Sequence, residues 1–275
     1  MITEVNGLKV YKSERLENYN DKVKYAVTTR LGGISKFPYE SLNISFKNIN
    51  DRENSDKNLD IVCNKLGFKR ENVIGIFEEH TDKVLVITEE NKDEYLFSKH
   101  HNHIYDALIT NVKNVPLTIT IADCNAIVMY DTKNNVVANI HSGWKGTIQK
   151  IYLNALNAMT DKFRTNPKDV ICVYSPTIQK CCWKTKDKEL AYGFEKYWKN
   201  VPLEEYVYTD DDGWNHVDFP YVITKDLINA GIKEENISNE NICTCCKVDT
   251  FFSYRKKTEL NEPDYGTQVS IVELI

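Results

Sequence analysis

Residues 117–163 decide the fold of this chain, and they read LTITIADCNAIVMYDTKNNVVANIHSGWKGTIQKIYLNALNAMTDKF. Leu117–Ala122, Ala126–Tyr130 and Val136–Ile140 are short apolar runs rich in β-branched residues, which is typical of strands. From about Thr147 to Phe163, apolar residues recur with the 3.6-residue period of a helix. Closely spaced strands that lead into an amphipathic helix favour a mixed α/β fold.

The rest of the chain continues this alternation without a long linker, an internal repeat or a low-complexity segment. Gly67 and Gly231 stand where two of the expected helices should stop. We expect further strands over Tyr25–Thr29, Val73–Phe77, Lys83–Ile87, Val170–Tyr174, Phe251–Tyr254 and Val269–Leu274. We expect further helices over Ser55–Leu66, Leu190–Trp198 and Ile223–Ala230.

Length and charge restrict the class of protein. With 275 residues, the chain can build either one domain or two small ones. A net charge of −5 and 40 acidic residues argue against a nucleic-acid partner. The N-terminal segment lacks the apolar core of a signal peptide, and no apolar run approaches the roughly 20 residues that span a bilayer. We therefore expect a cytoplasmic protein without membrane contact.

Eight cysteines raise the question of disulfides or a structural metal, and they are Cys63, Cys124, Cys172, Cys181, Cys182, Cys243, Cys245 and Cys246. A chain of this length without a signal peptide is expected to keep its thiols reduced. Cys181-Cys182 and the group from Cys243 to Cys246 could form a second zinc site in principle. Adjacent cysteines lack the usual gap between ligands of structural sites, so packed or reactive free thiols are favoured.

Three residues in separate segments point to a metal centre. His80 lies in EEHTD, Cys124 in TIADCNAI and His141 in NIHSGWKGT, each near an expected strand end. One thiolate and two imidazoles suit a borderline-soft divalent metal such as zinc, and three protein ligands leave a fourth position for water. The alternative is a buried cysteine with two hydrogen-bonded histidines, because the sequence spacing matches no local ligand motif. If they are ligands, we expect their coordinating atoms within about 4 Å of one another.

Two other segments carry weaker signals. His100-His101-Asn102-His103 is the densest histidine group, but its polar surroundings favour a loop that binds metal adventitiously. The segment Ser142–Thr147 joins a strand to a helix, and its glycines, free backbone N–H groups and Lys145 would suit phosphate. An ordinary turn with a solvated lysine is the alternative there.

Seven motifs occur in an order that resembles a known family. They are Thr28-Thr29-Arg30-Leu31-Gly32-Gly33-Ile34-Ser35, Pro38-Tyr39-Glu40-Ser41-Leu42-Asn43, His80, Asp106-Ala107-Leu108-Ile109-Thr110, Ala122-Asp123-Cys124, His141-Ser142-Gly143-Trp144-Lys145-Gly146 and Phe252-Ser253-Tyr254-Arg255. Together they resemble the bacterial laccase-domain family, also called multicopper polyphenol oxidoreductase or peptidoglycan editing factor. Relatives in that family include purine nucleoside phosphorylases. The resemblance extends from about Tyr25 to Leu274.

The resemblance implies a single laccase-like domain over residues 1–275, of the α/β (α+β) class, with mixed β-sheets flanked by helices. It implies a catalytic metal, zinc rather than copper, on His80, Cys124 and His141. The implied reaction is phosphorolysis of adenosine, inosine, guanosine and methylthioadenosine, with adenosine deamination as a second activity. The partners would then be purine nucleosides and phosphate, and the chain would be a monomer or a small homo-oligomer. Candidate substrate- or phosphate-binding residues are Arg30, Asn43, Asp123, Gly143 and Lys145.

This chain departs from the family pattern at several positions, while the three metal-ligand positions match. Glu78 replaces a usual Gln, Asn125 replaces a usual Pro, and Lys145 replaces a usual Arg. Lys184 and Thr267 also depart from the pattern. Because lysine lacks the bidentate fork of arginine, Lys145 keeps the charge at its position but not the geometry.

Three other classes of function compete with this reading. A cysteine hydrolase acting on peptidoglycan precursors would use Cys124 as nucleophile and His141 as base. A catalytically silent metal-binding protein is the second alternative. A multicopper oxidase is disfavoured, because six histidines are too few for several copper ions.

Overall fold

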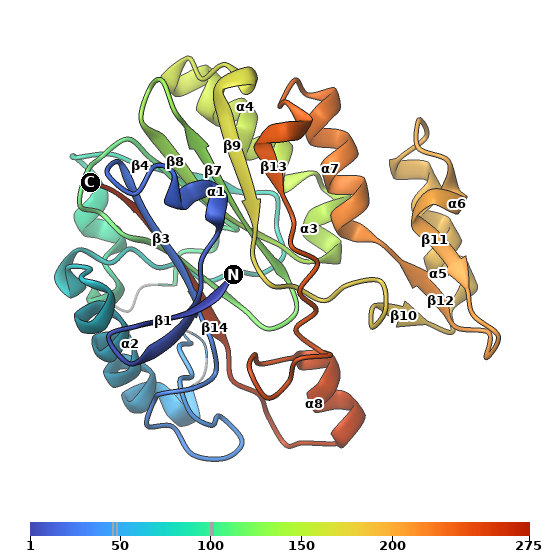
Figure 1. Cartoon of the computed structure of the whole chain (residues 1–275), viewed down its shortest axis with the longest axis horizontal. Coiled ribbons are helices and arrows are strands. Elements are labelled where there is room, and N and C mark those ends of the chain that lie inside the picture. The colour runs from blue at the N-terminus through green and yellow to red at the C-terminus, as the bar shows by residue number, and fades with distance from the viewer. Residues whose placement is uncertain (46, 48, 100–101) are drawn as a thin grey trace.

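The computed structural model describes residues 1–45, 47, 49–99 and 102–275, and two packed β-sheets dominate it (Figure 1). The first sheet has five strands in the order β1-β2-β3-β14-β6. Its strands are β1 (Ile2–Val5), β2 (Leu8–Tyr11), β3 (Val23–Thr28), β14 (Gln268–Leu274) and β6 (Leu117–Ile121). β14 pairs antiparallel with both β3 and β6, so the last strand of the chain occupies an inner position.

The second sheet has six strands in the order β13-β9-β7-β8-β5-β4. Its strands are β13 (Ile237–Ser238), β9 (Val170–Tyr174), β7 (Asn125–Asp131), β8 (Val136–Ser142), β5 (Ala107–Thr110) and β4 (Val84–Ile87). All residues of β7 and β8 are buried, because both faces of this sheet are covered. This explains why the central strands read as continuous apolar runs instead of alternating patterns.

Helices cover the outer faces of the two large sheets and give a four-layer arrangement (Figure 1). α4 (Ile151–Phe163) and α7 (Phe219–Asn229) pack on the six-stranded sheet, and α2 (Arg52–Leu66) packs on the five-stranded sheet. Side chains of β7 alternate between two cores: Val128 packs between the sheets, whereas Ile127 packs under α4 and α7. The structure also has the short helices α1 (Glu14–Glu17), α3 (Trp144–Ile148) and α8 (Tyr254–Leu260), and Leu16 of α1 packs in the core between the two large sheets.

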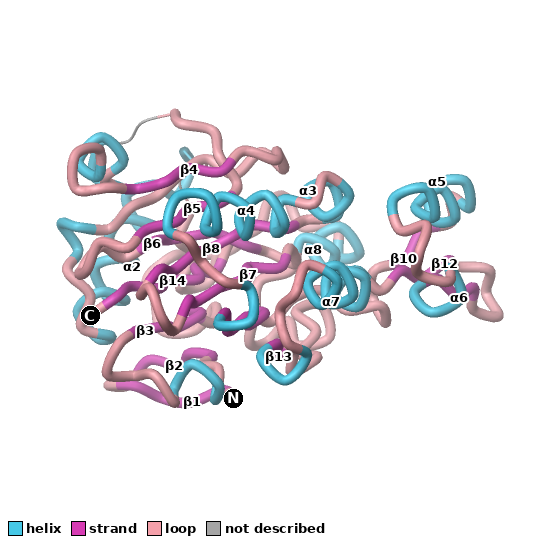
Figure 2. Tube along the Cα trace, turned by 90° about the horizontal axis from the view of Figure 1, so that it is seen from above, coloured by secondary structure: helices cyan, strands magenta, loops and turns pink. Residues whose placement is uncertain are grey.

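A third, smaller sheet stands apart from the sandwich, at the right of Figures 1 and 2. Its strand order is β10-β12-β11. It comprises β10 (Lys184–Thr185), β11 (Val207–Thr209) and β12 (Asn215–Val217), with α5 (Lys188–Tyr192) and α6 (Leu203–Tyr206) beside it. An aromatic core around Phe194 and Trp198 joins this region to Trp144 of α3 and Phe219 of α7.

The mixed α/β class, with several sheets flanked by helices, is confirmed, and most expected elements are present. Val170–Tyr174 forms β9 with the expected bounds, and α2 ends before Gly67, which adopts a φ of 73°. The expected helix over Leu190–Trp198 is instead α5 followed by a 3₁₀ turn over Gly193–Tyr197.

Three expectations about elements were wrong. Val73–Phe77 is not a continuous strand. It forms only isolated bridges, from Ile74 to Leu96 and Leu117 and from Phe77 to Ile104. Phe251–Tyr254 is not a strand, since Ser253 caps α8 by accepting from the N–H of Lys256. The expected helix from Thr147 to Phe163 is two helices, because Lys150 takes a φ of 59° between α3 and α4.

Within the described residues, no helix has both the length and the apolar character needed to cross a bilayer.

Candidate metal centre

A cavity of about 740 Å³ opens at the edge where the two large sheets meet. The three residues expected to bind a metal, His80, Cys124 and His141, all line it. Its size lies within the range of small-molecule binding sites, roughly 300–1,000 Å³.

Cys124 lies where the chain passes from one sheet to the other. β6 of the five-stranded sheet ends at Ile121, and β7 of the six-stranded sheet begins at Asn125. The reversal between them places Asp123 at a φ of 89°. Thus the connection between sheets presents the thiol at the edge of the sandwich.

His141 reaches the same point because of the register between β7 and β8. These strands are antiparallel, with Ala126 opposite His141 and Asn125 opposite Ser142. His141 is buried, and its Nδ1 lies 2.7 Å from Oδ1 of Asp106. With a proton on Nδ1, His141 donates to the carboxylate and leaves Nε2 free to face Cys124 and a metal.

His80 is held in place by the same carboxylate. Asp106 accepts hydrogen bonds from the backbone N–H of His80 at 3.0 Å and from both the N–H and the hydroxyl of Thr81, at 2.6 and 2.7 Å. These bonds support a backbone φ of 59° at His80, a conformation that non-glycine residues seldom adopt. Asp106 therefore positions both imidazoles, one through its side chain and the other through its backbone.

The three coordinating atoms converge. Nε2 of His80 lies 3.7 Å from Sγ of Cys124, and the ligand atoms of His80, Cys124 and His141 all lie within 4.8 Å of one another. Zinc bonds of about 2.3 Å to sulfur and 2.0 Å to nitrogen place such atoms roughly 3.5 Å apart in a tetrahedron. The donor set and its geometry therefore fit a zinc ion with one open position.

The charges of these groups depend on one another. Burial disfavours the thiolate of Cys124, but the charge and hydrogen bond of His141, followed by those of His80, outweigh it and lower the pKa of Cys124 to about 6. Burial disfavours the imidazolium of His141, but Cys124 and Asp106 outweigh it and raise the pKa of His141 to about 10. Both shifts favour a thiolate beside an imidazolium when no metal is bound, and a cation can take the place of the proton.

Gly143 is required by packing at the metal centre. A Cβ atom at this position would lie 2.6 Å from Cδ2 of His80 and 2.8 Å from Sγ of Cys124. Gly143 also lines the cavity, and its expected role in phosphate binding stays a prediction. The two candidate ligands His80 and Cys124 occupy the space beside its Cα atom.

The other candidate residues have different positions. Lys145 is exposed and lines the cavity, whereas Arg30 and Asn43 are not among the residues that line it. Arg30 donates to the carbonyls of Glu40 and Val248, and Asn43 donates to Asp51. These bonds hold neighbouring loops together, and a substrate role for Arg30 or Asn43 stays a prediction.

Asp123 borders the cavity, but its carboxylate is directed into a neighbouring loop. It accepts hydrogen bonds from the hydroxyls of Thr244 and Ser253 and from the backbone N–H of Arg255. Both oxygens are thus engaged, and Asp123 anchors the segment before α8 beside Cys124.

Asp106 is the residue that the sequence did not reveal as part of the site. It belongs to one of the seven motifs, yet β5, which starts at the next residue, was not expected as a strand. The short apolar run Ala107–Thr110 could have indicated that strand, with a carboxylate at its beginning.

The histidine group at 100–103 does not join the centre in the part of the chain that is described. His100 and His101 lie outside the described residues. His103 is exposed, with its ring centroid 4.9 Å from that of Tyr95.

The family model described as multi-copper polyphenol oxidoreductase laccase matches residues 24–275, which is nearly the whole chain. The chain belongs to this family. The motif order, the Cys–His–His cluster and this match therefore agree.

Relatives with assigned names span most of the chain. A protein of Staphylococcus saprophyticus named purine nucleoside phosphorylase is 28% identical over 254 residues, covering 90% of this chain and 93% of its own length. A Mus musculus protein of the same name is 30% identical over 92% of this chain and 56% of its own length. The crystal structure of a hypothetical protein, YfiH, from Bacillus licheniformis has a TM-score of 0.85 and 24% identity, covering 99% of this chain and 98% of that one. This last likeness supports the fold alone.

Proposed function

We propose that this chain is a zinc-dependent purine nucleoside phosphorylase that also deaminates adenosine. The observation that carries the proposal is the convergence of His80, Cys124 and His141 at the wall of a cavity large enough for a nucleoside. The relatives named purine nucleoside phosphorylase support the choice of reaction.

A metal-dependent reaction gives His80, Cys124 and His141 a common role as ligands of one ion. When bound, zinc supplies a Lewis acid and lowers the pKa of its water to about 7. Asp106 keeps His141 in the tautomer that presents Nε2, and it holds the backbone of His80. The role of His80, Cys124 and His141 in this proposal is to hold the metal ion at the cavity wall, with one coordination position open to the cavity.

The cavity walls suit the two parts of the substrate. Trp183, Phe219 and Tyr265 line it and offer aromatic faces to a purine base. Lys145 lies on the same cavity and offers a cation to phosphate. Its neighbour Trp144 contributes a further ring, whose centroid lies 5.7 Å from the lysine Nζ.

The proposal is tested with zinc-loaded protein, adenosine and phosphate. We expect adenine and ribose-1-phosphate from phosphorolysis, and inosine from deamination, with separate assays on inosine, guanosine and methylthioadenosine. Omission of phosphate should abolish adenine formation but not inosine formation. If none of these nucleosides is consumed by zinc-loaded protein, the proposed activity is wrong.

A second candidate is a cysteine hydrolase, because Cys124, His141 and Asp106 are arranged like a nucleophile, a base and an orienting acid. His80 distinguishes the two. A hydrolase has no necessary use for His80, whereas a metal centre does. Metal loss and activity loss together in both His80→Ala and Cys124→Ala would support the metal centre. Retained activity in His80→Ala, insensitivity to chelators and inactivation by alkylation of Cys124 would support the hydrolase.

A further inference from the structure

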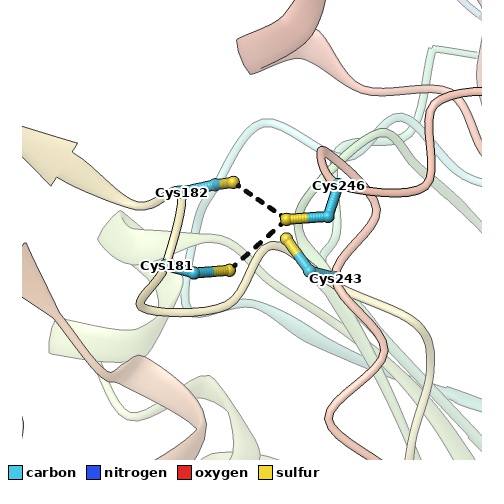
Figure 3. A group of neighbouring side chains, drawn as sticks. All are labelled: Cys181, Cys182, Cys243 and Cys246. Carbon is cyan, nitrogen blue, oxygen red and sulfur yellow. Dashed lines mark hydrogen bonds between the residues drawn. The ribbon is translucent and has the colours of Figure 1, made fainter.

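Four cysteines from two segments that are distant in sequence point toward one another (Figure 3). Cys181 and Cys182 precede β10, while Cys243 and Cys246 lie between β13 and α8. The segments are held side by side by hydrogen bonds from the N–H of Thr177 to the carbonyl of Ile242 and from the N–H of Thr244 to the carbonyl of Thr177. The cysteine cluster therefore belongs to a defined contact between two backbone segments.

The distances between the sulfur atoms match those of metal ligands. Sγ of Cys246 lies 3.4 Å from that of Cys182 and 3.6 Å from that of Cys181, and all four sulfur atoms lie within 4.8 Å of one another. A disulfide would place two sulfur atoms about 2.05 Å apart. Zinc–sulfur bonds of about 2.3 Å place the corners of a tetrahedron roughly 3.8 Å apart.

The sequence spacing of two of these cysteines is also typical of zinc ligands. In the sequence, adjacent cysteines argue against a structural metal site, because they lack the usual gap between ligands. The structure selects Cys243 and Cys246, which are separated by two residues as in many zinc sites. Cys245, which lies between them, is buried and is not a member of the set.

We propose that Cys181, Cys182, Cys243 and Cys246 form a second metal site, a closed tetrathiolate that binds zinc for a structural purpose. Four thiolate ligands leave no open position, so this site binds metal without catalysing a reaction. It differs in ligands and location from the centre at His80, Cys124 and His141. The proposal is therefore independent of the reaction that the chain catalyses.

The position of the cluster indicates what the ion would stabilise. Nη1 of Arg255 donates to the carbonyls of Cys182 and Lys184, at 2.8 and 3.0 Å. The hydroxyl of Thr244, next to Cys243, donates to Asp123 at 2.6 Å. Because Asp123 precedes Cys124, the tetrathiolate would fix the loops that support one wall of the cavity and the start of the small sheet.

The test is a count of zinc ions per chain in protein purified under reducing conditions and equilibrated with buffered zinc. We expect two ions in the natural protein, one in Cys181→Ser/Cys246→Ser, one in His80→Ala/Cys124→Ala, and none when all four substitutions are combined. Cys245→Ala is the matched control in the same loop and should keep two. Loss of an ion in Cys245→Ala, or an unchanged count in Cys181→Ser/Cys246→Ser, would overturn the assignment.

Cobalt replacement keeps the test independent of folding defects in the cluster variants. In His80→Ala/Cys124→Ala, the four cluster thiols are intact, so bound Co²⁺ should show the strong thiolate charge-transfer absorption of four sulfur ligands. Absence of this absorption, or an intramolecular disulfide among these cysteines in freshly purified reduced protein, would overturn the proposal. Absence of phosphorolysis would leave both the ion count and the spectrum unaffected.

Discussion

Single residues decide whether the metal centre at His80, Cys124 and His141 can form. Gly143 leaves the space that His80 and Cys124 occupy, and Asp106 positions the two imidazoles. Neither residue is a ligand, yet both act on the distances between ligands. Displacement of a reacting group by about 1 Å can lower the rate on the order of 100-fold. Substitution of Gly143 or Asp106 is therefore expected to reduce activity strongly.

Gly143→Ala should lower zinc affinity at this centre and lower turnover on the order of 100-fold, because its Cβ would displace His80 and Cys124. Gly193→Ala is the control, since nothing lies within 4 Å of a Cβ added there. Zinc titration and steady-state rates would measure both variants. An unchanged zinc affinity in Gly143→Ala would contradict the argument that a Cβ atom at this position displaces His80 and Cys124.

Asp106→Asn should weaken zinc binding by about 10- to 100-fold, because an amide cannot accept all the hydrogen bonds that reach this carboxylate. Competition with a chelating dye would measure the affinity. Asp131→Asn serves as the control, since Asp131 is also buried but binds the turn at Lys133 and Asn134. Equal zinc affinities in the two variants would show that Asp106 does not act on the metal site.

At the scale of elements, the position of β8 determines where His141 lies. Asn139 of β8 donates to the carbonyls of Leu117 and Ser270, both at 3.0 Å, and accepts from the hydroxyl of Ser270. Leu117 and Ser270 belong to β6 and β14 of the other sheet. One buried amide therefore links the two sheets two residues before the candidate ligand His141.

Asn139→Leu should lower the free energy of unfolding by about 3 kcal/mol, because it leaves buried polar groups of both sheets without partners. Urea denaturation would measure this loss. Asn157→Ala, at an exposed position of α4, should change the stability by less than about 0.5 kcal/mol. A similar small loss in Asn139→Leu would mean that water replaces the amide.

For the whole molecule, metal bound at the candidate sites would connect segments that are distant in sequence. An ion on His80, Cys124 and His141 would join the loop before β4 to the turn before β7 and the end of β8. The proposed tetrathiolate joins the small sheet to the segment before α8. Stability should therefore depend on zinc as well as on the packing of apolar side chains.

Free zinc at about 100 times its dissociation constant should raise the free energy of unfolding by roughly 2.7 kcal/mol for each occupied site. Chelation should lower the melting temperature, and Cys181→Ser/Cys246→Ser should lose only part of this dependence. Calorimetry with and without chelator would measure it. An identical melting temperature in zinc-loaded and chelated protein would contradict stabilisation by metal.

The sequence alone was sufficient to predict the central strands, most of the helices and the convergence of His80, Cys124 and His141. Strand and helix periods reflect local burial, and the ligand types carry their own chemistry, so both can be read without coordinates. Tertiary structure decided what depends on contacts between distant segments. It placed Asp106 beside both imidazoles and Gly143 against the two candidate ligands. It also brought Cys243 and Cys246, but not Cys245, together with Cys181 and Cys182. These outcomes depend on strand register and on the crossing between sheets, and no local pattern encodes either of them.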